Sequence, residues 1–217
     1  MSLAIFDLDN TLIAGDSDYL WGEFLIEQSI VDRKSFKQSN DAFYDDYCRG
    51  ELDIVAYQRF ALTPLSKFSM VELNELHNEF MRMKIYPLML TKAQTLIEKH
   101  RLAGDTLLII TATNRFVTGP IAKALNIDTL LATEGEIVDG RYTGEPTGTP
   151  CFAEGKVTRL REWLITTNNT LDNAFFYSDS HNDLPLLKLV DNPVAVDPDP
   201  TLSDTATDAG WPIISLR

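Results

Sequence analysis

Cysteine and histidine are scarce in this chain of 217 residues, which contains two cysteines and three histidines. Cys48 and Cys151 are too few, and too far apart in the sequence, to form a disulfide framework or a metal site made of thiolates. We therefore expect both to be free thiols. The classes of protein whose fold depends on disulfides or on cysteine-bound metal are excluded.

Basic residues are also few, because 19 Lys and Arg stand against 32 Asp and Glu, for a formal net charge of -13. Such a surface repels phosphate backbones and anionic membranes, so we expect neither nucleic acid nor membrane as a partner. A small anionic substrate can still bind where a metal ion, a lysine or helix N-termini reverse the local field.

Long hydrophobic runs are missing, and no apolar stretch approaches the ~20 residues of a membrane span. The first residues carry no basic segment and reach an acid at Asp7, so we expect no secretory signal and a cytoplasmic location. Hydrophobic residues make up 44% and charged residues 24% of the chain, which is ordinary globular composition. The length suits one sizeable core with an inserted subdomain.

Short apolar runs alternate along the chain with segments of helical spacing. The runs that read as buried strands cover residues 3–6, 107–111, 174–178, 193–197 and 211–215. The segments that read as helices cover residues 91–104, 115–126, 153–167 and 182–190. This alternation predicts an α/β fold, with a Rossmann-like, mostly parallel sheet flanked by helices.

One long segment interrupts the alternation. Residues 16–86 contain no strand-like run but show helical spacing and many aromatic residues, and they are far too long for a loop. We expect an inserted all-helical subdomain there, with residues 1–15 and 87–217 forming the core. A β-hairpin is predicted at Asp139-Gly140.

Acids and hydroxyls follow three of the predicted strands at the point where each strand ends. Asp7 and Asp9 follow the first, Thr111 the second, and Asp179 and Asp183 the third. In open α/β sheets ligands bind beyond the carboxyl ends of the strands, so these side chains should share one rim. Converging carboxylates attract Mg²⁺, which takes one or two of them together with waters and a substrate phosphate. We expect Asp7 and Asp179 to supply these carboxylates.

These residue types suit phosphoryl transfer. Asp7 can act as a nucleophile, since an aspartyl-phosphate intermediate splits one displacement into two easier steps. Asp9 can protonate the leaving group and later deprotonate the attacking water. The transferred group also needs cations and hydrogen-bond donors around its oxygens, and Lys156 and Thr111 are suitable for this role.

Four elements of the sequence together resemble a known family. They are FDLDNTL at 6–12, LLIIT at 107–111, Lys156 and YSDSHND at 177–183. In order and approximate spacing they resemble the four motifs of haloacid-dehalogenase-superfamily phosphatases, over essentially the whole chain. The predicted helical insertion is similar to the small cap of the phosphoserine-phosphatase-like branch, whose small bacterial hydrolases include histidinol-phosphatases.

The resemblance implies a role for each matching residue. It makes Asp7 the nucleophile, and Asp9 the general acid and base whose backbone carbonyl is a further metal ligand. It makes Thr111 and Lys156 the phosphate clamp and Asp179 a ligand of Mg²⁺.

Two further residues of the last motif also have counterparts in the resemblance. Asn182 is implied as a phosphate contact. Asp183 is implied either as a metal ligand or as an acid that supports one, whereas its position before a predicted helix also suits a helix cap. The aromatic residues of the insertion have two readings as well, as the core of the cap or as a wall facing the substrate.

The phosphoserine-phosphatase pattern also bears on the substrate. Asp16 stands where that pattern carries an acid that meets the substrate's ammonium group. Where the pattern carries an Arg for the substrate carboxylate, this chain has Ala61, with Arg59 two residues short. A substrate with an amine but no carboxylate, such as histidinol phosphate, is therefore favoured, with Asp16, Asp18 or Glu23 as counter-charges.

We predict a Mg²⁺-dependent phosphatase, monomeric or weakly dimeric, that hydrolyses a small phosphomonoester, with histidinol phosphate as the candidate substrate. Three alternatives remain at this point. The first is a phosphoserine phosphatase, and the second is a phosphotransferase or mutase of the same chemistry. The third is a noncatalytic protein that binds a phosphate ligand or serves as a scaffold.

Overall fold

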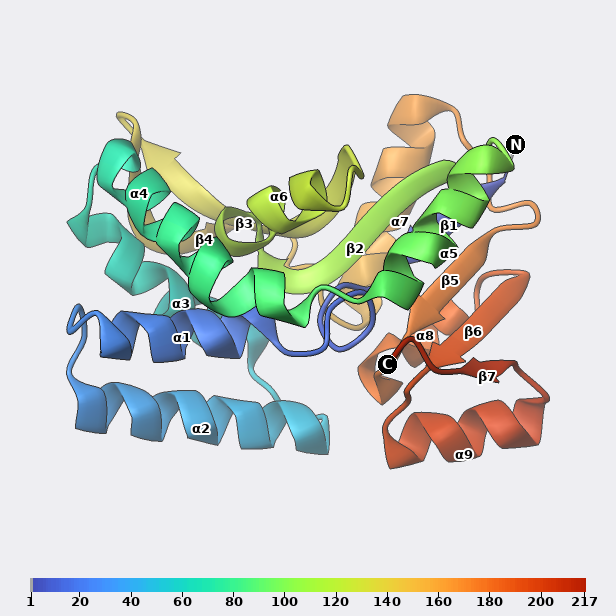
Figure 1. Cartoon of the computed structure of the whole chain (residues 1–217), viewed down its shortest axis with the longest axis horizontal. Coiled ribbons are helices and arrows are strands. Elements are labelled where there is room, and N and C mark those ends of the chain that lie inside the picture. The colour runs from blue at the N-terminus through green and yellow to red at the C-terminus, as the bar shows by residue number, and fades with distance from the viewer. Residues whose placement is uncertain (1) are drawn as a thin grey trace.

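A seven-stranded sheet forms the centre of the computed structural model, which describes residues 2–217 (Figure 1). The strand order is β4-β3-β2-β1-β5-β6-β7, and every neighbouring pair is parallel except β3 and β4. The strands are β1 (Leu3–Phe6), β2 (Thr106–Asn114), β3 (Thr129–Val138), β4 (Arg141–Thr147), β5 (Phe175–Ser178), β6 (Asn192–Val196) and β7 (Ile213–Ile214).

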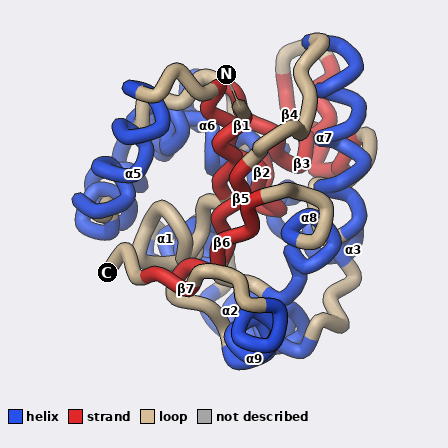
Figure 2. Tube along the Cα trace, turned by 90° about the vertical axis from the view of Figure 1, so that its right-hand side faces the viewer, coloured by secondary structure: helices blue, strands red, loops and turns tan. Residues whose placement is uncertain are grey.

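Helices cover both faces of this sheet, as the view along its edge shows (Figure 2). The side chains of β1 alternate, so that Ala4 and Phe6 join one hydrophobic cluster while Leu3 and Ile5 join another. The first cluster packs on α5 (Thr91–Leu102) and α6 (Arg115–Ala124). The second packs on α7 (Glu154–Thr167), α8 (Leu184–Leu187) and α9 (Pro200–Ala209).

The predicted α/β fold is confirmed, with differences at the ends of elements. Strand β2 runs on to Asn114 because its end pairs with Thr133 of β3 after an irregularity in the register. Strand β7 covers only two residues of the predicted run, and the backbone amide of Ala195 in β6 bonds the carbonyl of Pro212 just before it. The predicted hairpin is present as β3 and β4.

Residues 17–88 form helices and helical turns between β1 and α5. The α-helices are α1 (Ser17–Glu27), α2 (Arg33–Arg49), α3 (Ile54–Leu62) and α4 (Met70–Phe80). Each begins at a residue whose side chain accepts backbone N–H groups of the first turn, which is the preferred way to start a helix. The four capping residues are Asp16, Asp32, Asp53 and Ser69.

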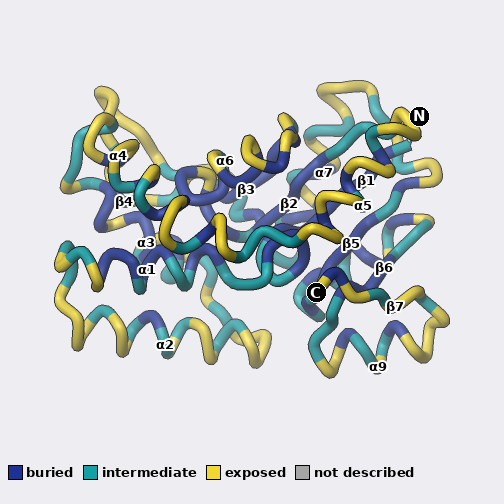
Figure 3. Tube along the Cα trace, viewed as in Figure 1, coloured by how far each residue is buried: buried dark blue, intermediate teal, exposed yellow. Residues whose placement is uncertain are grey.

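The inserted helices are unequally buried (Figure 3). Helix α1 packs inward, where Trp21 lies edge-on to Phe80 of α4 and to Phe116 of α6, with ring centroids 5.1 and 5.2 Å apart. Helix α2, by contrast, has a single buried residue, Asn40. Helix α1 is therefore part of the core, whereas α2 lies on the surface.

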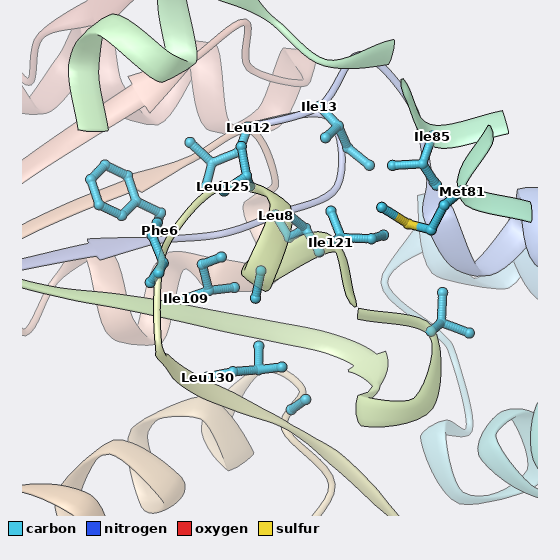
Figure 4. Close-up of a cluster of buried hydrophobic side chains, with 14 of the residues drawn as sticks. Phe6, Leu8, Leu12, Ile13, Met81, Ile85, Ile109, Ile121, Leu125 and Leu130 are labelled. Atoms are coloured by element: carbon cyan, nitrogen blue, oxygen red, sulfur yellow. The ribbon is translucent and has the colours of Figure 1, made fainter. Parts of the chain in front are cut away.

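The same core continues from the sheet into the π-helical segment Met81–Ile85 that follows α4. Figure 4 shows the Met81 and Ile85 side chains beside those of Leu8 and Ile121 in one apolar cluster. The insertion thus shares its interior with the sheet and has no separate core of its own at this end.

The chain leaves the sheet and returns to it at neighbouring points. Ile13 and Met89 form an antiparallel bridge, and the backbone N–H of Ala14 donates to the carbonyl of Leu88 over 2.9 Å. Within residues 2–217, none of the helices has the length and apolar character needed to cross a membrane.

Candidate active site

A narrow pocket lies where the ends of β1, β2 and β5 meet the inserted helices. Its cavity volume is about 60 Å³, so it suits a small molecule rather than a polymer. Its lining comprises Asp7, Asp9, Asn10, Asp16, Asp18, Tyr19, Asn40, Phe43, Tyr44, Tyr47, Leu52, Ile54, Tyr57, Thr111, Ala112, Thr113, Phe152, Lys156, Asn182 and Asp183.

Asp7 lies at the floor of this pocket, directly after β1. Its backbone N–H donates to the carbonyl of Tyr177 in β5 over 2.9 Å, which fixes its position between the two strands. Its Oδ1 accepts a hydrogen bond from Lys156 Nζ at 2.7 Å. Burial raises the pKa of Asp7 to about 7, although Lys156 opposes the shift. A cation is therefore needed beside Asp7 to keep it ionised.

Lys156 supplies part of that charge from the first turn of α7. Its Nζ also contacts both carboxylate oxygens of Asp183, at 2.7 and 2.8 Å, and the Ser178 hydroxyl donates to the same acid over 2.7 Å. The neighbouring Gly155 is required here, since a Cβ at that position would lie 2.0 Å from the carbonyl oxygen of Pro150. Asp183 makes no side-chain cap for α8, so its contacts are those of a partner for Lys156.

Asp9 lies between the sheet and the inserted helices. Its Oδ1 accepts the backbone N–H of Ser17 at 2.6 Å, and its Oδ2 accepts the Thr113 hydroxyl at 2.8 Å. Burial and the charge of Asp16 raise the pKa of Asp9 to about 6, against the lowering effect of these hydrogen bonds. Such a value lies near neutrality, where a carboxyl group can both give and take a proton.

Asp179 directly follows β5, at the same edge of the sheet, but it is not among the residues that line the pocket. Its Oδ1 accepts the Thr11 hydroxyl at 2.9 Å. Burial, and after it the charge of Asp7, raises the pKa of Asp179 well above its usual range. The charges of Asp7 and Asp179 repel each other, and a bound cation would relieve this repulsion.

These acids fit a hard divalent cation bound in part by substrate and water. Within residues 2–217, no three side chains of His, Cys, Asp or Glu are arranged to hold a metal ion by themselves. Mg²⁺ does not require such a group, because it usually takes one or two carboxylates and keeps several waters. Among residues 2–217, Asp7 and Asp179 each keep one carboxylate oxygen without a hydrogen bond, whereas Asp183 is engaged by Lys156. The donor set therefore fits Mg²⁺.

Three further predicted residues, Thr111, Asn182 and Asp16, line the pocket, whereas Glu23 does not and forms an ion pair with Lys37. Thr111 is buried at the edge of the pocket, and Asn182 lines it while donating to the backbone carbonyl of Tyr47 over 3.3 Å. Asp16 lines it too, but its Oδ1 accepts the backbone N–H groups of Asp18 and Tyr19. Asp16 thus caps α1 and keeps only its other oxygen for a ligand.

The aromatic residues of the insertion divide between the two roles that the sequence left open. Trp21 and Phe24 belong to the buried core. Others form the wall of the pocket, namely Tyr19, Phe43, Tyr44, Tyr47 and Tyr57. The sequence therefore predicted their presence but could not separate the two sets.

Arg59 does not reach the pocket and instead forms an ion pair with Glu145 of β4 at 2.8 Å. Lys156 is the single basic residue in the described lining, where it is already bound to Asp7 and Asp183. The pocket thus offers acids and aromatic rings, and no free cation, to the part of a ligand that lies under the inserted helices.

Several contacts of the site were missed at the sequence level. Thr113 holds Asp9, and Thr11 holds Asp179. Tyr47 on α2 donates to the Ser180 hydroxyl over 3.1 Å and so joins the insertion to the last motif. Of these residues, only Thr113 could have been predicted from the sequence. It lies two residues beyond Thr111 on the same strand, and therefore on the same face of the sheet.

Comparison with protein families gives a match over most of the chain. The haloacid dehalogenase-like hydrolase family matches residues 4–188. A histidinol-phosphatase of Neisseria meningitidis is 46% identical over 220 residues, covering 100% of this chain and 99% of that protein. A phosphoserine phosphatase of Mycobacterium tuberculosis is 32% identical over 221 residues, covering 99% of this chain and 70% of that protein.

Solved structures show the same fold. A protein of unknown function from Bordetella pertussis has a TM-score of 0.94 at 44% identity, covering 100% of this chain and 99% of that chain. A phosphoserine phosphatase solved as a phospho-aspartyl intermediate analogue has a TM-score of 0.69 at 17% identity, covering 100% and 93%. The family match, the sequence relatives and the acid-lined rim agree, and this chain belongs to the haloacid dehalogenase-like hydrolase family.

Proposed function

We propose that this hydrolase is a Mg²⁺-dependent phosphatase that cleaves a small phosphomonoester through an aspartyl-phosphate intermediate on Asp7. One observation carries the proposal. Two carboxylates, the buried Asp7 and the half-buried Asp9, lie in one narrow pocket, with Lys156 bound to the first and the backbone of α1 bound to the second. This arrangement supports a nucleophile and a proton donor with distinct roles.

In the first step a carboxylate oxygen of Asp7 attacks phosphorus and forms the aspartyl phosphate, while the bond between phosphorus and the ester oxygen breaks. Lys156 and Thr111 face the pocket from α7 and β2, where they bind phosphate oxygens and balance their charge. Asp9, with its pKa raised to about 6, gives its proton to the leaving alkoxide. A bound Mg²⁺, held by Asp7, Asp179 and the backbone carbonyl of Asp9, supplies further charge neutralisation.

In the second step the roles of the carboxyl groups change. Asp9 is now ionised and takes a proton from a water molecule, which attacks the phosphorus of the aspartyl phosphate. Asp7 is released as a carboxylate, and inorganic phosphate leaves. The Ser17 and Thr113 hydrogen bonds hold Asp9 in place through both steps.

Residues 16–86 act in this proposal as a cap that excludes bulk water from the pocket, and 1–15 with 87–217 act as the catalytic core. The aromatic wall of α2 supports this division, because it covers the acids at the ends of the strands. Every residue needed for the two steps comes from one chain, which supports a monomer or a weakly associated dimer.

We propose histidinol phosphate as the substrate. The described lining offers no free basic residue for a carboxylate, and Arg59 is engaged by Glu145, so phosphoserine loses the ion pair that it would need. Asp16 and Asp18 instead suit a positively charged leaving group. The similarity to a histidinol-phosphatase supports the same substrate.

Replacing the nucleophile tests the proposed chemistry. With Mg²⁺ present, the parent protein should release inorganic phosphate from p-nitrophenyl phosphate, and Asp7→Asn should lower the rate by about 10³-fold or more because no aspartyl phosphate can form. EDTA should inhibit the parent protein. An Asp7→Asn variant that turns over at the parent rate, or a parent protein indifferent to EDTA, contradicts the assignment.

A substrate comparison tests the choice of ester and of acceptor. Histidinol phosphate and phosphoserine are supplied at equal concentrations, and released phosphate and alcohol are both measured. We expect the kcat/KM for histidinol phosphate to exceed that for phosphoserine by about 10-fold or more, since an unmatched carboxylate is costly in an acidic pocket. A phosphotransferase would instead release alcohol without an equal amount of phosphate.

A further inference from the structure

Asp18 is a buried carboxylate that faces the pocket without a cation. It is the second residue of α1, its exposed fraction is 6%, and it lies in the pocket lining. Its one hydrogen bond from an amide is long, 3.5 Å from Asn114 Nδ2, and the Tyr57 phenol is its other polar neighbour. Within residues 2–217, no Lys, Arg or His forms an ion pair with it.

A structural role for this carboxylate is already filled by another residue. Asp16 caps α1, so Asp18 is not needed to satisfy the first N–H groups of that helix. The dipole of α1 favours an acid in the first turn, but this effect is modest beside the cost of burying an unpaired charge. Burial and the charges of Asp16 and Asp9 accordingly raise its pKa well above the usual range. At this position the fold thus retains a carboxylate that no basic residue among residues 2–217 neutralises.

Asp16 and Asp18 have different neighbours in the pocket. Asp16 directly precedes Ser17, whose backbone N–H donates to Asp9. Asp18 instead has Asn114, the capping residue of α6, and Tyr57 of α3 as its polar neighbours. Tyr57 in turn lies edge-to-face with Phe43, another residue of the pocket lining, with ring centroids 5.4 Å apart.

We propose that Asp18, supported by Tyr57, binds a second nitrogen-bearing group of the substrate, a planar heterocycle with an N–H donor, while Asp16 meets the ammonium group nearer the phosphate. This inference rests on the proposed phosphatase function and adds a specificity-determining residue to it. The heterocycle donates its N–H to the Asp18 carboxylate and packs against the rings of the wall. A substrate class follows, namely phosphate esters of amino alcohols that carry an imidazole-like ring.

The test compares two substrates that differ in the ring. Histidinol phosphate carries an ammonium group and an imidazole, and phosphoethanolamine carries the ammonium group alone. We expect Asp18→Asn to lower the ratio of their kcat/KM values by about 10- to 100-fold, mainly through a higher KM for histidinol phosphate, as the loss of a charge-assisted hydrogen bond predicts. An equal loss for both substrates would place Asp18 on the ammonium group and overturn the proposal, as would an unchanged ratio.

A matched control and a binding measurement complete the experiment. Asp128→Asn makes the same change at an exposed residue outside the pocket lining, and it should leave the ratio unchanged. Asp18→Asn should be at least as stable to heat as the parent, because it removes an unpaired buried charge, whereas a purely structural role predicts a loss.

Binding of histidinol phosphate to Asp7→Asn is then compared, by calorimetry, with binding to the Asp7→Asn, Asp18→Asn double variant. Because this readout needs no turnover, weaker binding by the double variant supports the role of Asp18 even if the nucleophile is misassigned. Equal binding refutes that role even if the phosphatase assignment stands.

Discussion

At the scale of single residues, Asp9 is a half-buried acid that is held firmly in place. Both of its carboxylate oxygens accept hydrogen bonds, one from the start of α1 and one from the end of β2. Its pKa, raised to about 6, lets the protonated and ionised forms interchange near neutrality. A general acid is then available for the first step and a general base for the second.

Asp9→Asn should separate the two steps. The Asn side chain keeps an oxygen for the Ser17 N–H, and p-nitrophenolate leaves without protonation, so aspartyl phosphate still forms. Its hydrolysis lacks a base and should slow by about 10²- to 10⁴-fold. Stopped-flow measurements should show a burst of nitrophenolate equal to the enzyme concentration. A slow linear trace without a burst would show that Asp9 is needed for the first step even with this leaving group.

Single residues also show how far the sequence could predict the site. Asp7, Asp9, Thr111 and Asp179 could be predicted as site candidates because an apolar run followed by a polar residue marks the end of a buried strand, and those ends share a rim. Thr11 could not be assigned to Asp179, because 168 positions separate them and only the folded chain brings them together.

At the scale of elements, α2 differs from the other inserted helices. It has a single buried residue, yet Phe43, Tyr44 and Tyr47 on it form part of the pocket wall. Its end rests on the core through the bond from Tyr47 to Ser180 and through Gly50, whose φ is 70°. These few contacts are consistent with a helix that opens more readily than α1, which packs in the shared interior.

Gly50→Ala should weaken this attachment. The new Cβ would lie 3.1 Å from Nε2 of His181, so the end of α2 must shift away from the last motif. We expect a two- to fivefold higher KM, roughly, with a loss in stability of about 1 kcal/mol from the positive φ. Steady-state kinetics and thermal melts measure the two effects.

Gly210→Ala is the matched control for this substitution. Gly210 ends α9 with a φ of 69°, but a Cβ there meets nothing within 4 Å. The control should lose similar stability without a change in KM. If both variants raise KM alike, the contact with His181 does not hold the cap.

The helices themselves were predictable from sequence to within a few residues, whereas their partners were not. Helical spacing in residues 16–86 indicated a bundle, but it could not reveal that α1 packs against α6 through Trp21 and Phe116. An apolar stripe defines which face of a helix is buried and leaves open what buries it. The distinction between a core helix and a covering helix therefore required the structure.

At the scale of the whole molecule, the buried acids make stability depend on pH and on metal. The folded-state pKa values of Asp7 and Asp9, about 7 and 6, lie above the ordinary value of 3.8. Between pH 3.8 and about pH 7 the folded state therefore binds more protons than the unfolded state. The free energy of unfolding must then fall as the pH rises through this range. Hydrogen bonds from Ser69 lower the pKa of Glu72, so the stability that this residue contributes is lost only as the pH falls to more acidic values.

In EDTA, the free energy of unfolding should fall by about 2 kcal/mol or more between pH 5 and pH 8. Mg²⁺ at ~100 times its Kd should restore about 2.7 kcal/mol at pH 8, which corresponds to a rise in Tm of roughly 5–10 °C. Urea denaturation and thermal melts measure these changes. A metal-free protein that gains stability toward pH 8, or a Tm indifferent to Mg²⁺, would contradict the described charge balance.

The bridge between Ile13 and Met89 brings the two ends of the insertion together beside the sheet. Because both ends of the insertion lie at this one point, the inserted segment can become longer or shorter without altering the spacing of β1 and α5. Evolution can thus change the inserted helices, which contact the leaving group, while the residues at the ends of the strands, which act on phosphorus, stay the same. New substrate specificities then arise from changes in one inserted segment.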